Sequence, residues 1–221
     1  MPCIEEVNEK RTINNILQMK IALNILLTLA AIGLIYLLVE SIRKPINFTE
    51  TRDLREEFVR ERLTQAAELQ KVYKSLRGNY AESYDSLKYA LTNDTFLVDK
   101  VIGDKYDTTT QVKIVQIKFP AKDSLLSMIK KKKPNMTIDE FFDFVSTVPF
   151  SEGKKFYIKR SEAIVEGTDS MMTSTFEIGT TIGTYLSEFD SASHVIYDPE
   201  YNPNELRKVG DLYKPSTNGN W

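Results

Sequence analysis

The stretch Ile21–Val39, IALNILLTLAAIGLIYLLV, decides the organisation of this chain. It contains no charged residue, with Lys20 directly before it and Glu40 directly after it. At about 1.5 Å of rise per residue, a helix of this length nearly matches a hydrocarbon core of about 30 Å. We therefore predict a membrane-spanning helix, which makes the membrane the first partner of the protein.

The composition of the remaining chain argues against burying this stretch inside a soluble domain. A buried helix needs a second apolar layer around it, and the residues beyond 39 are too polar to supply one. The chain carries 29 basic and 31 acidic residues, so no global field attracts nucleic acid and we expect no nucleic-acid partner. The one dense basic run is Lys130–Lys133, which we interpret as a solvated loop or helix end rather than a phosphate or lipid site.

Residues 1–20 form a short head of mixed charge, which we place in the cytoplasm. A cleavable signal peptide has a shorter apolar region and a small-residue cleavage site, whereas ESIRK follows the apolar run here, so we expect no cleavage. Basic residues flank both ends of the run, and a long domain translocates largely regardless of its charge. We therefore place the following domain outside the cytoplasm. It contains no cysteine and needs neither disulfides nor a reducing compartment.

A second, amphipathic helix is predicted from about Thr51 to Leu76. Pro45 interrupts or ends the first helix, because proline lacks an N–H and clashes with the preceding turn. Gly78 is well placed to end the second helix with a left-handed residue. Apolar residues recur every three or four positions, which predicts one packed face with charged residues outside it. The apolar stripe is Val59, Leu63, Ala66, Leu69, Tyr73 and Leu76, and the charged residues are Arg52, Glu56, Arg60, Glu61, Glu68 and Lys71.

The second half of the chain predicts short strands and short helices. Runs of branched residues favour strands, and Thr137-Ile138-Asp139-Glu140 is a capping box that begins a helix. Strands are predicted over 96–102, 112–119 and near 172–178, a hairpin over 155–160 and 163–166, short helices over 84–91 and 181–189, and a loop-rich tail from residue 198.

These elements define an α+β fold class. It consists of one N-terminal transmembrane helix, a long amphipathic helix and a small, mostly antiparallel sheet with short helices. We divide the chain into a cytoplasmic head (1–20), a transmembrane helix (21–39), a juxtamembrane helical stalk (40–78) and an extracytoplasmic α+β domain (79–221). The domain is long enough for a core of its own.

A candidate association face lies on the apolar stretch. Asn24, Thr28 and Ala31 recur at i, i+4 and i+7, and Gly33 lies near the same face. Small and polar residues let helices approach closely in lipid and share hydrogen bonds. The other interpretation is that one asparagine and one threonine are tolerated near the interface. The first interpretation predicts that the protein binds itself or other envelope proteins through this helix.

Residues that could carry catalysis or hold a cofactor are sparse. The one histidine, His194, has neighbouring serines but no nucleophile or acid that the sequence assigns to it. One histidine and one remote cysteine cannot form a transition-metal site of the usual ligands. Acidic residues such as Asp139, Glu140 and Asp143 have a commoner explanation in the helix dipole, and no glycine-rich phosphate loop is visible. We expect a protein without a cofactor that is not an enzyme.

One short pattern recurs more often than composition predicts. Asp followed by Ser or Thr and a small or aliphatic residue occurs five times, and all five copies lie beyond the apolar stretch. The pattern resembles the acceptor of a bacterial general O-glycosylation system that acts outside the inner membrane. Alternatively, Asp-Ser and Asp-Thr favour turns and helix caps. The candidate acceptors are Ser86, Thr108, Ser124, Ser170 and Ser191.

The order of helices and the residues that end the second helix resemble the type IV pilins and type II secretion pseudopilins. Leu63, Leu69, Tyr73, Gly78 and Tyr80 carry this resemblance, which covers roughly residues 21–91. It implies a helix that starts in the membrane, continues into the soluble domain and packs on a small antiparallel sheet. The chain departs from the family in three ways: it has no basic-Gly-Phe cleavage signal, no glutamate early in the apolar run, and an alanine where proline usually follows the second tyrosine.

These observations predict a non-enzymatic, single-pass protein of the bacterial inner membrane. We expect a periplasmic, pilin-like domain that works as a structural or assembly subunit. The alternative is an anchored ligand-sensing or solute-binding domain, which a deep apolar pocket with convergent polar groups would favour. An anchored hydrolase is a third interpretation, which a serine or carboxylate within reach of His194 would favour.

Overall fold

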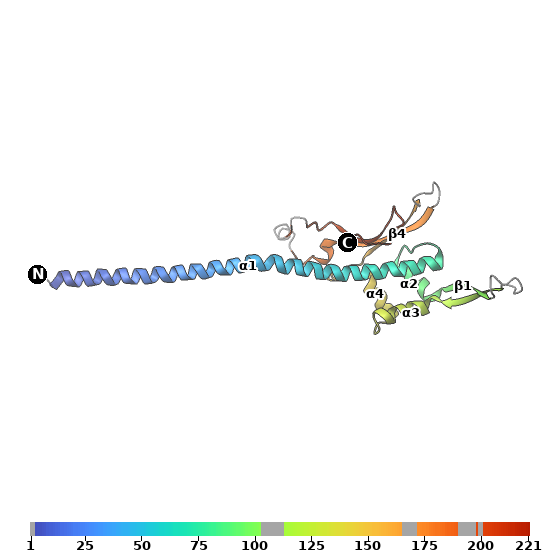
Figure 1. Ribbon diagram of the computed structural model, residues 1–221, viewed down its shortest axis with the longest axis horizontal. Helices are drawn as coiled ribbons and strands as arrows, with labels where there is room; N and C mark the ends of the chain where they lie inside the picture. The colour runs from blue at the N-terminus through green and yellow to red at the C-terminus, as the bar shows by residue number, and fades with distance from the viewer. Residues whose placement is uncertain (1–2, 103–112, 165–171, 190–197, 199–200) are drawn as a thin grey trace. The chain divides into compact units, whose positions relative to one another are not determined.

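The computed structural model describes residues 3–102, 113–164, 172–189, 198 and 201–221 (Figure 1). The chain divides into two compact units, residues 1–51 and residues 52–221. The α+β fold class is confirmed: the described elements are a long N-terminal helix, short helices and two small antiparallel sheets. His194 lies outside the described residues, as do the candidate acceptors Thr108, Ser170 and Ser191.

Helix α1 extends over Cys3–Arg77 and contributes to both units. The prediction that Pro45 interrupts or ends the helix is wrong, because α1 is continuous through it. A proline ring removes a single backbone donor, and the surrounding turns of a helix of 75 residues keep theirs. The carbonyl of Pro45 also accepts a hydrogen bond from Thr49 Oγ1 at 3.0 Å. The end of α1 was predicted correctly: Gly78 is left-handed, with φ of 79°, and its N–H donates to the carbonyl of Lys74.

The part of α1 in unit 2 is covered on more than one side. Figure 1 shows α3 and α4 along one side of it and the sheet that contains β4 along the other. The predicted apolar stripe is confirmed, since its first four members are fully buried and the last two are partly buried in the same core. The prediction that all charged residues lie outside the packed surface is wrong for Glu56, which is buried. A single apolar stripe predicts that other elements pack on one face of the helix only. Here elements pack on two sides of α1, so polar residues beside the stripe are buried as well.

Gln70 shows how such a polar flank is satisfied. Its side chain is fully buried, and its amide nitrogen donates to the carbonyl of Ala81 at 3.1 Å. The N–H of Ala81 donates back to Gln70 Oε1 at 2.9 Å. The N–H and the carbonyl of Ala81, in the turn that leaves α1, are thus both paired inside the core, which fixes the path of the chain toward the next helix.

Three further helices pack beside α1 in unit 2. Helix α2, Tyr84–Asn93, has Ser83 as its N-cap, and helix α4, Ile138–Ser146, begins with the predicted capping box of Thr137 and Glu140. Helix α3, Ala121–Lys132, was missed because its apolar residues are few and its first residue follows a strand without a break. The buried residues Leu87, Leu91, Leu125, Ile129, Phe141 and Val145 join these helices to the core.

The first sheet is a two-stranded ribbon, β1 (Thr95–Ile102) with β2 (Lys113–Pro120). Both strands were predicted. They pair in antiparallel register from Thr95 opposite Pro120 to Ile102 opposite Lys113. An ion pair fixes the base of the ribbon, since the guanidinium of Arg77 holds both carboxylate oxygens of Asp94, at 2.5 and 3.0 Å.

The second sheet has the order β3-β4-β5, all antiparallel. The predicted hairpin of 155–160 with 163–166 is wrong: residues 157–164 form one strand, β3 (Tyr157–Ile164), which pairs with β4 (Met172–Thr181). The predicted loop-rich tail contains strand β5 (Leu206–Asp211), and the predicted helix after residue 181 is a single turn, α5 (Ile182–Tyr185). Pairing with β4 decided the first two differences, since β3 and β5 each pair with it along their whole length.

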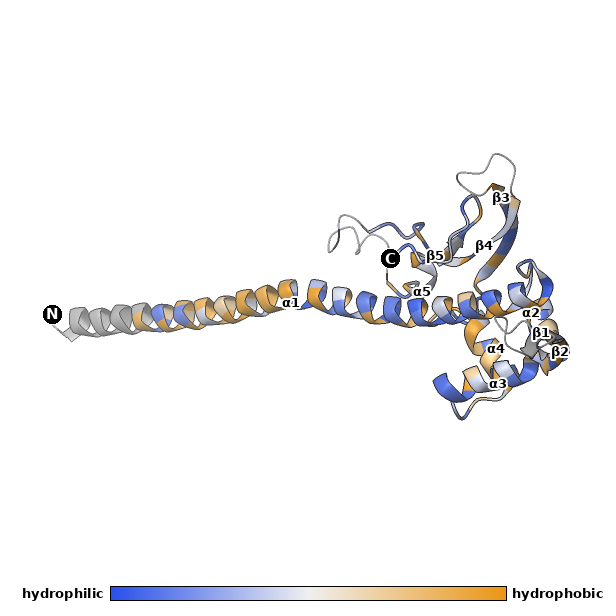
Figure 2. Cartoon of the chain, turned by 45° about the vertical axis from the view of Figure 1, so that its right-hand side comes forward, coloured by the Kyte–Doolittle hydropathy of each residue, from blue (hydrophilic) through white to orange (hydrophobic). Residues whose placement is uncertain are grey.

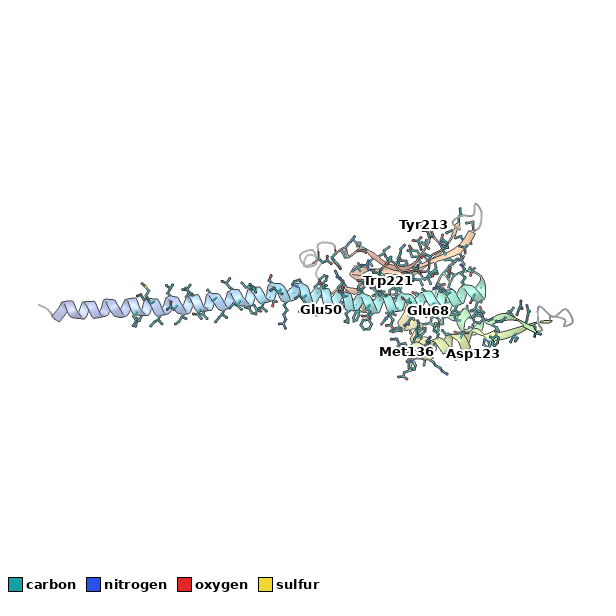
Figure 3. The ribbon with its side chains drawn as sticks, viewed as in Figure 1. Glu50, Glu68, Asp123, Met136, Tyr213 and Trp221 are labelled. Atoms are coloured by element: carbon teal, nitrogen blue, oxygen red, sulfur yellow. The ribbon has the colours of Figure 1, made fainter. Side chains whose placement is uncertain are left out.

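The last residues of the chain lie against α1 in unit 2. Gly219 forms an isolated bridge with Val209 of β5, and the N–H of Asn220 donates to the carbonyl of Lys208. Trp221 and Glu68 line opposite sides of a groove of about 410 Å³ between this tail and the helix (Figure 3). Trp221 is the one tryptophan of the chain, so its fluorescence reports the tertiary structure of unit 2.

Candidate functional site

The apolar part of α1 in unit 1 holds the first candidate site. It is long and apolar enough to cross a membrane, and none of its apolar window is buried within the chain. Figure 2 shows this part of α1 predominantly in the colour of hydrophobic residues. Residues 21–38 are all exposed, so no other described segment covers them. A helix surface this apolar needs lipid or another apolar partner around it.

The predicted association residues share one face of this helix. Thr28 Oγ1 donates to the backbone carbonyl of Asn24 at 2.8 Å, one turn earlier, and this hydrogen bond satisfies the hydroxyl inside the helix. The side-chain amide of Asn24 has no hydrogen-bond partner among the described residues. Ala31 is exposed, and a side chain added at Gly33 would meet no atom within 4 Å. Small residues here are therefore not required by contacts within the chain.

A shallow groove of about 330 Å³ follows this face. It is lined by Ile21, Asn24, Ile25, Thr28 and Leu29. Its walls are aliphatic, and the Asn24 amide contributes two donors and one acceptor. This combination of shape and polarity suits a second helix that fills the groove and pairs with the amide.

Unit 2 contains a second candidate site, a charged cleft of about 410 Å³ beside the first turns of its helix. Glu56 is its central group: the carboxylate accepts from Arg60 at 2.8 Å and from Arg207 at 2.7 Å. Burial raises the pKa of Glu56, but the hydrogen bonds and charges of the two guanidinium groups outweigh burial and lower the pKa below its usual value. The lining consists of Arg52, Asp53, Glu56, Arg60, Ile182, Asp198, Tyr201, Asn202, Glu205 and Arg207.

The guanidinium groups of this cleft already have carboxylate partners. Arg52 pairs with Asp198, and Arg207 pairs with Glu205 as well as with Glu56. An anionic ligand would have to displace these carboxylates. The arrangement therefore joins the helix to residues 146 and 151 positions later in the chain and acts as a structural clamp.

Arg55, which precedes Glu56 on the helix, adds further contacts of the same kind to residues 130 and 133 positions later in the chain. It is 8% exposed, and it donates to the carbonyl of Tyr185 at 2.8 Å and to Glu188 at 2.7 Å. Its guanidinium also lies over the ring of Phe150, 4.8 Å from the centroid. Sequence analysis missed Arg55, Glu56 and Arg207 as a group. The i, i+4 pair of Glu56 with Arg60 was the visible local signal, but the contribution of Arg207 depends on the fold.

The lysine run 130–133 has intramolecular partners. Lys132 pairs with Glu68 of α1 at 2.5 Å, and Lys133 pairs with Glu61 at 3.2 Å. The ammonium of Lys133 also lies over the ring of Phe144. The run ends α3, where positive charge also complements the helix dipole. These contacts give the run a role in holding α3 against α1.

Two of the candidate acceptors lie in the described part of the chain. Ser124 is exposed in the first turn of α3. Ser86 is only partly exposed, and its hydroxyl donates to the carbonyl of Ser83 at 2.9 Å within the N-terminal cap of α2. The capping role of Ser86 corresponds to the alternative interpretation of the pattern. Ser124 has the accessibility that a modifying enzyme requires.

The acidic residues that open α4 have structural partners. Glu140 Oε2 accepts from the N–H of Thr137 at 2.8 Å, and Asp139 pairs with Lys88 at 2.8 Å. Among the residues that the structure describes, no group of three His, Cys, Asp or Glu side chains is arranged to hold a metal ion.

Comparison of the chain with protein-family models, with curated proteins and with solved structures gives no match. The architecture itself is pilin-like, since a long N-terminal apolar helix precedes small antiparallel sheets.

Proposed function

We propose that this chain is a non-enzymatic, single-pass protein of the bacterial inner membrane that works as a structural or assembly subunit. The apolar helix anchors it, and the periplasmic domain is unit 2 with its pilin-like order of elements. The observation that carries the proposal is the groove beside Asn24, where an unpaired amide lies on an otherwise apolar and exposed helix surface.

In a bilayer, the amide of Asn24 in this groove favours contact with a second helix over contact with lipid. Lipid offers an amide no hydrogen bond, whereas a neighbouring helix offers both an apolar surface and a polar partner. Burying Asn24, Thr28 and Ala31 against a second helix removes an unsatisfied group from lipid and brings two backbones close together. The partner is a second copy of this chain or another envelope protein with a similar face.

The clamp in unit 2 supports a structural role. The charged side chains of Arg55, Glu56 and Arg207 pair with other groups of the domain and hold the helix to it, so they are not available to a ligand. The cleft beside them is lined mainly by charged groups, not by the apolar surface that a ligand-sensing domain of the alternative kind would present. We therefore do not propose solute binding.

Two finer features belong to the same proposal. The resemblance to pilins and pseudopilins, together with the missing cleavage signal, supports a subunit that stays anchored in the membrane. The five acceptor patterns support O-glycosylation outside the cytoplasm, and exposed Ser124 is the acceptor in the described chain that we expect to be modified.

The test compares helix association in membranes. Replacing Asn24 and Thr28 by leucine together removes the polar groups and fills the groove while keeping the helix apolar. We expect association to weaken by about 1–2 kcal/mol, measured by cross-linking or by energy transfer between labelled copies in vesicles. Leu26→Ala changes the opposite side of the helix and is the matched control. If the double variant associates as strongly as the parent, the helix only anchors the protein in the membrane, and the proposal is wrong.

A further inference from the structure

The groove of about 410 Å³ between α1 and the tail of the chain lies entirely within unit 2 and shares no lining residue with the charged cleft. On α1, Thr64, Glu68 and Lys71 recur at i, i+4 and i+7, which places them on one side of the helix. The buried side chains of Ala67 and Val209 form the apolar part of the lining. The tail supplies the remaining lining residues: Thr217, Asn218, Gly219 and Trp221.

Hydrogen bonds to β5 fix the tail side of this groove. The carbonyl of Asn218 accepts from the N–H of Gly210 at 3.0 Å, and the N–H of Asn220 donates to the carbonyl of Lys208 at 3.2 Å. The side chain of Asn220 also accepts from the N–H of Lys208 at 2.9 Å and donates to the carbonyl of Leu206 at 2.7 Å. This side of the groove is therefore formed before any ligand arrives, which lowers the entropy that binding must overcome.

The indole of Trp221 is held in one orientation by the backbone of its own tail. A Cβ at Gly219 would lie 2.3 Å from two carbon atoms of the indole, so only glycine leaves room for the ring there. Trp221 is 42% exposed and does not belong to the buried core cluster. The ring is thus a flat apolar surface, fixed in place beside the polar groups of the groove.

Those polar groups retain unused hydrogen-bonding capacity. Lys132 donates to Oε2 of Glu68 at 2.5 Å, which fixes the carboxylate and leaves its Oε1 without a partner among the described residues. In the same part of the chain, the ammonium of Lys71, the hydroxyl of Thr217 and the side-chain amide of Asn218 also have no partner. Donors, acceptors and both signs of charge are present. This set suits an uncharged ligand with many hydroxyl groups, because each hydroxyl both donates and accepts.

We infer that this groove binds a neutral saccharide. A pyranose ring of the gluco configuration carries its hydroxyl groups in equatorial positions, so its flat sides present C–H groups that stack on an indole. The hydroxyl groups at the ring edge then pair with the carboxylate, the amide and the ammonium. A lipid chain would leave these polar groups unpaired, and the carboxylate of Glu68 would repel a phosphate. The inference goes beyond the proposed function and does not depend on the anchor helix.

The size and openness of the groove favour part of a glycan over a free solute. Sites for small molecules enclose about 70–90% of the ligand in about 300–1,000 Å³. This groove lies at the lower end of that range and is half open to solvent. It therefore covers only part of a saccharide, which suits attachment of unit 2 to a polysaccharide.

Titration of the full chain with neutral disaccharides tests the groove directly. Cellobiose and N,N′-diacetylchitobiose are the probes, because both have the gluco configuration, and sorbitol is the control, because it has the hydroxyl groups without a ring. The protein is kept in a polyoxyethylene detergent, since a detergent with a sugar headgroup would compete for the groove. Trp221 is the one tryptophan of the chain, so its fluorescence reports the groove. We expect a shift to shorter wavelength with a disaccharide, half complete at roughly 1 mM, and no shift with sorbitol.

Variants locate the bound sugar. Trp221→Ala and Asn218→Ala should each weaken disaccharide binding about tenfold, measured by isothermal titration calorimetry, because one removes the stacking surface and the other removes the amide. Tyr213→Ala is the matched control and should bind as the parent does. Tyr213 is 84% exposed, does not line the groove and lies apart from Trp221 (Figure 3). Far-UV circular dichroism checks that each variant folds, as expected for residues outside the core.

The inference is wrong if neither disaccharide shifts the fluorescence or releases heat. Equal affinity of the parent, Trp221→Ala and Asn218→Ala would place the sugar elsewhere and would also overturn it. A shift with sodium phosphate but with neither disaccharide would show that Lys71 binds an anion in the groove instead. None of these results affects the anchor proposal, which the association of the Asn24 and Thr28 double variant tests separately.

Discussion

Gln70 offers the sharpest test of how the core of unit 2 is held together. Gln70→Leu keeps a side chain of similar size but removes the donor to the Ala81 carbonyl and the acceptor of the Ala81 N–H. Ala81 is 1% exposed, so water cannot replace these partners. Each buried backbone group left without a partner costs about 1–3 kcal/mol. Allowing for the apolar gain of leucine, we expect the free energy of unfolding to fall by about 2–4 kcal/mol.

Gln65 is the matched control on the same helix. It is 3% exposed, donates one hydrogen bond to Glu61 at 3.0 Å, and leaves its side-chain oxygen buried without a partner among the described residues. Gln65→Leu therefore removes one hydrogen bond and also one unsatisfied acceptor. We expect this change to alter the free energy of unfolding by less than about 1 kcal/mol.

The assay is urea unfolding of the full chain in mild detergent, followed by the fluorescence of Trp221. This signal follows unit 2, because the tryptophan lines the groove between the tail and α1. For a unit of this size the expected loss for Gln70→Leu corresponds to a fall in Tm of roughly 5–15 °C. Equal losses for Gln70→Leu and Gln65→Leu would refute the reasoning, since burial of a glutamine rather than its pairing with Ala81 would then decide the cost.

Two further predictions concern the clamp and the orientation of the chain. Because the pKa of Glu56 in the fold lies below its unfolded value, its ion pairs stabilise unit 2 above about pH 4.5 and this contribution is lost as the pH falls further. Urea unfolding at pH 7 and pH 3.5 should therefore show a smaller pH dependence for Glu56→Gln than for the parent, and an unchanged dependence would contradict the assignment. Protease added to spheroplasts should digest unit 2, and complete protection in sealed cells would show that it faces the cytoplasm.

Local signals in the sequence determined several parts of this protein. The uncharged stretch 21–39 predicts an apolar helix because composition over such a length suffices. Gly78 and the capping box at Thr137 predicted a helix end and a helix start, because both act through backbone groups a few residues away. Strands β1 and β2 were likewise visible as runs of branched residues.

The tertiary structure decided what depends on partners distant in the chain. Strand β3 is a single strand because pairing along its whole length with β4 replaces the predicted hairpin. Strand β5 forms in a segment rich in loop residues because β4 offers it a free edge. Glu56 belongs to a buried clamp only because the fold brings Arg207 to it from 151 positions away. Local propensity reaches a few residues along the chain, whereas these contacts exist only once segments far apart have met.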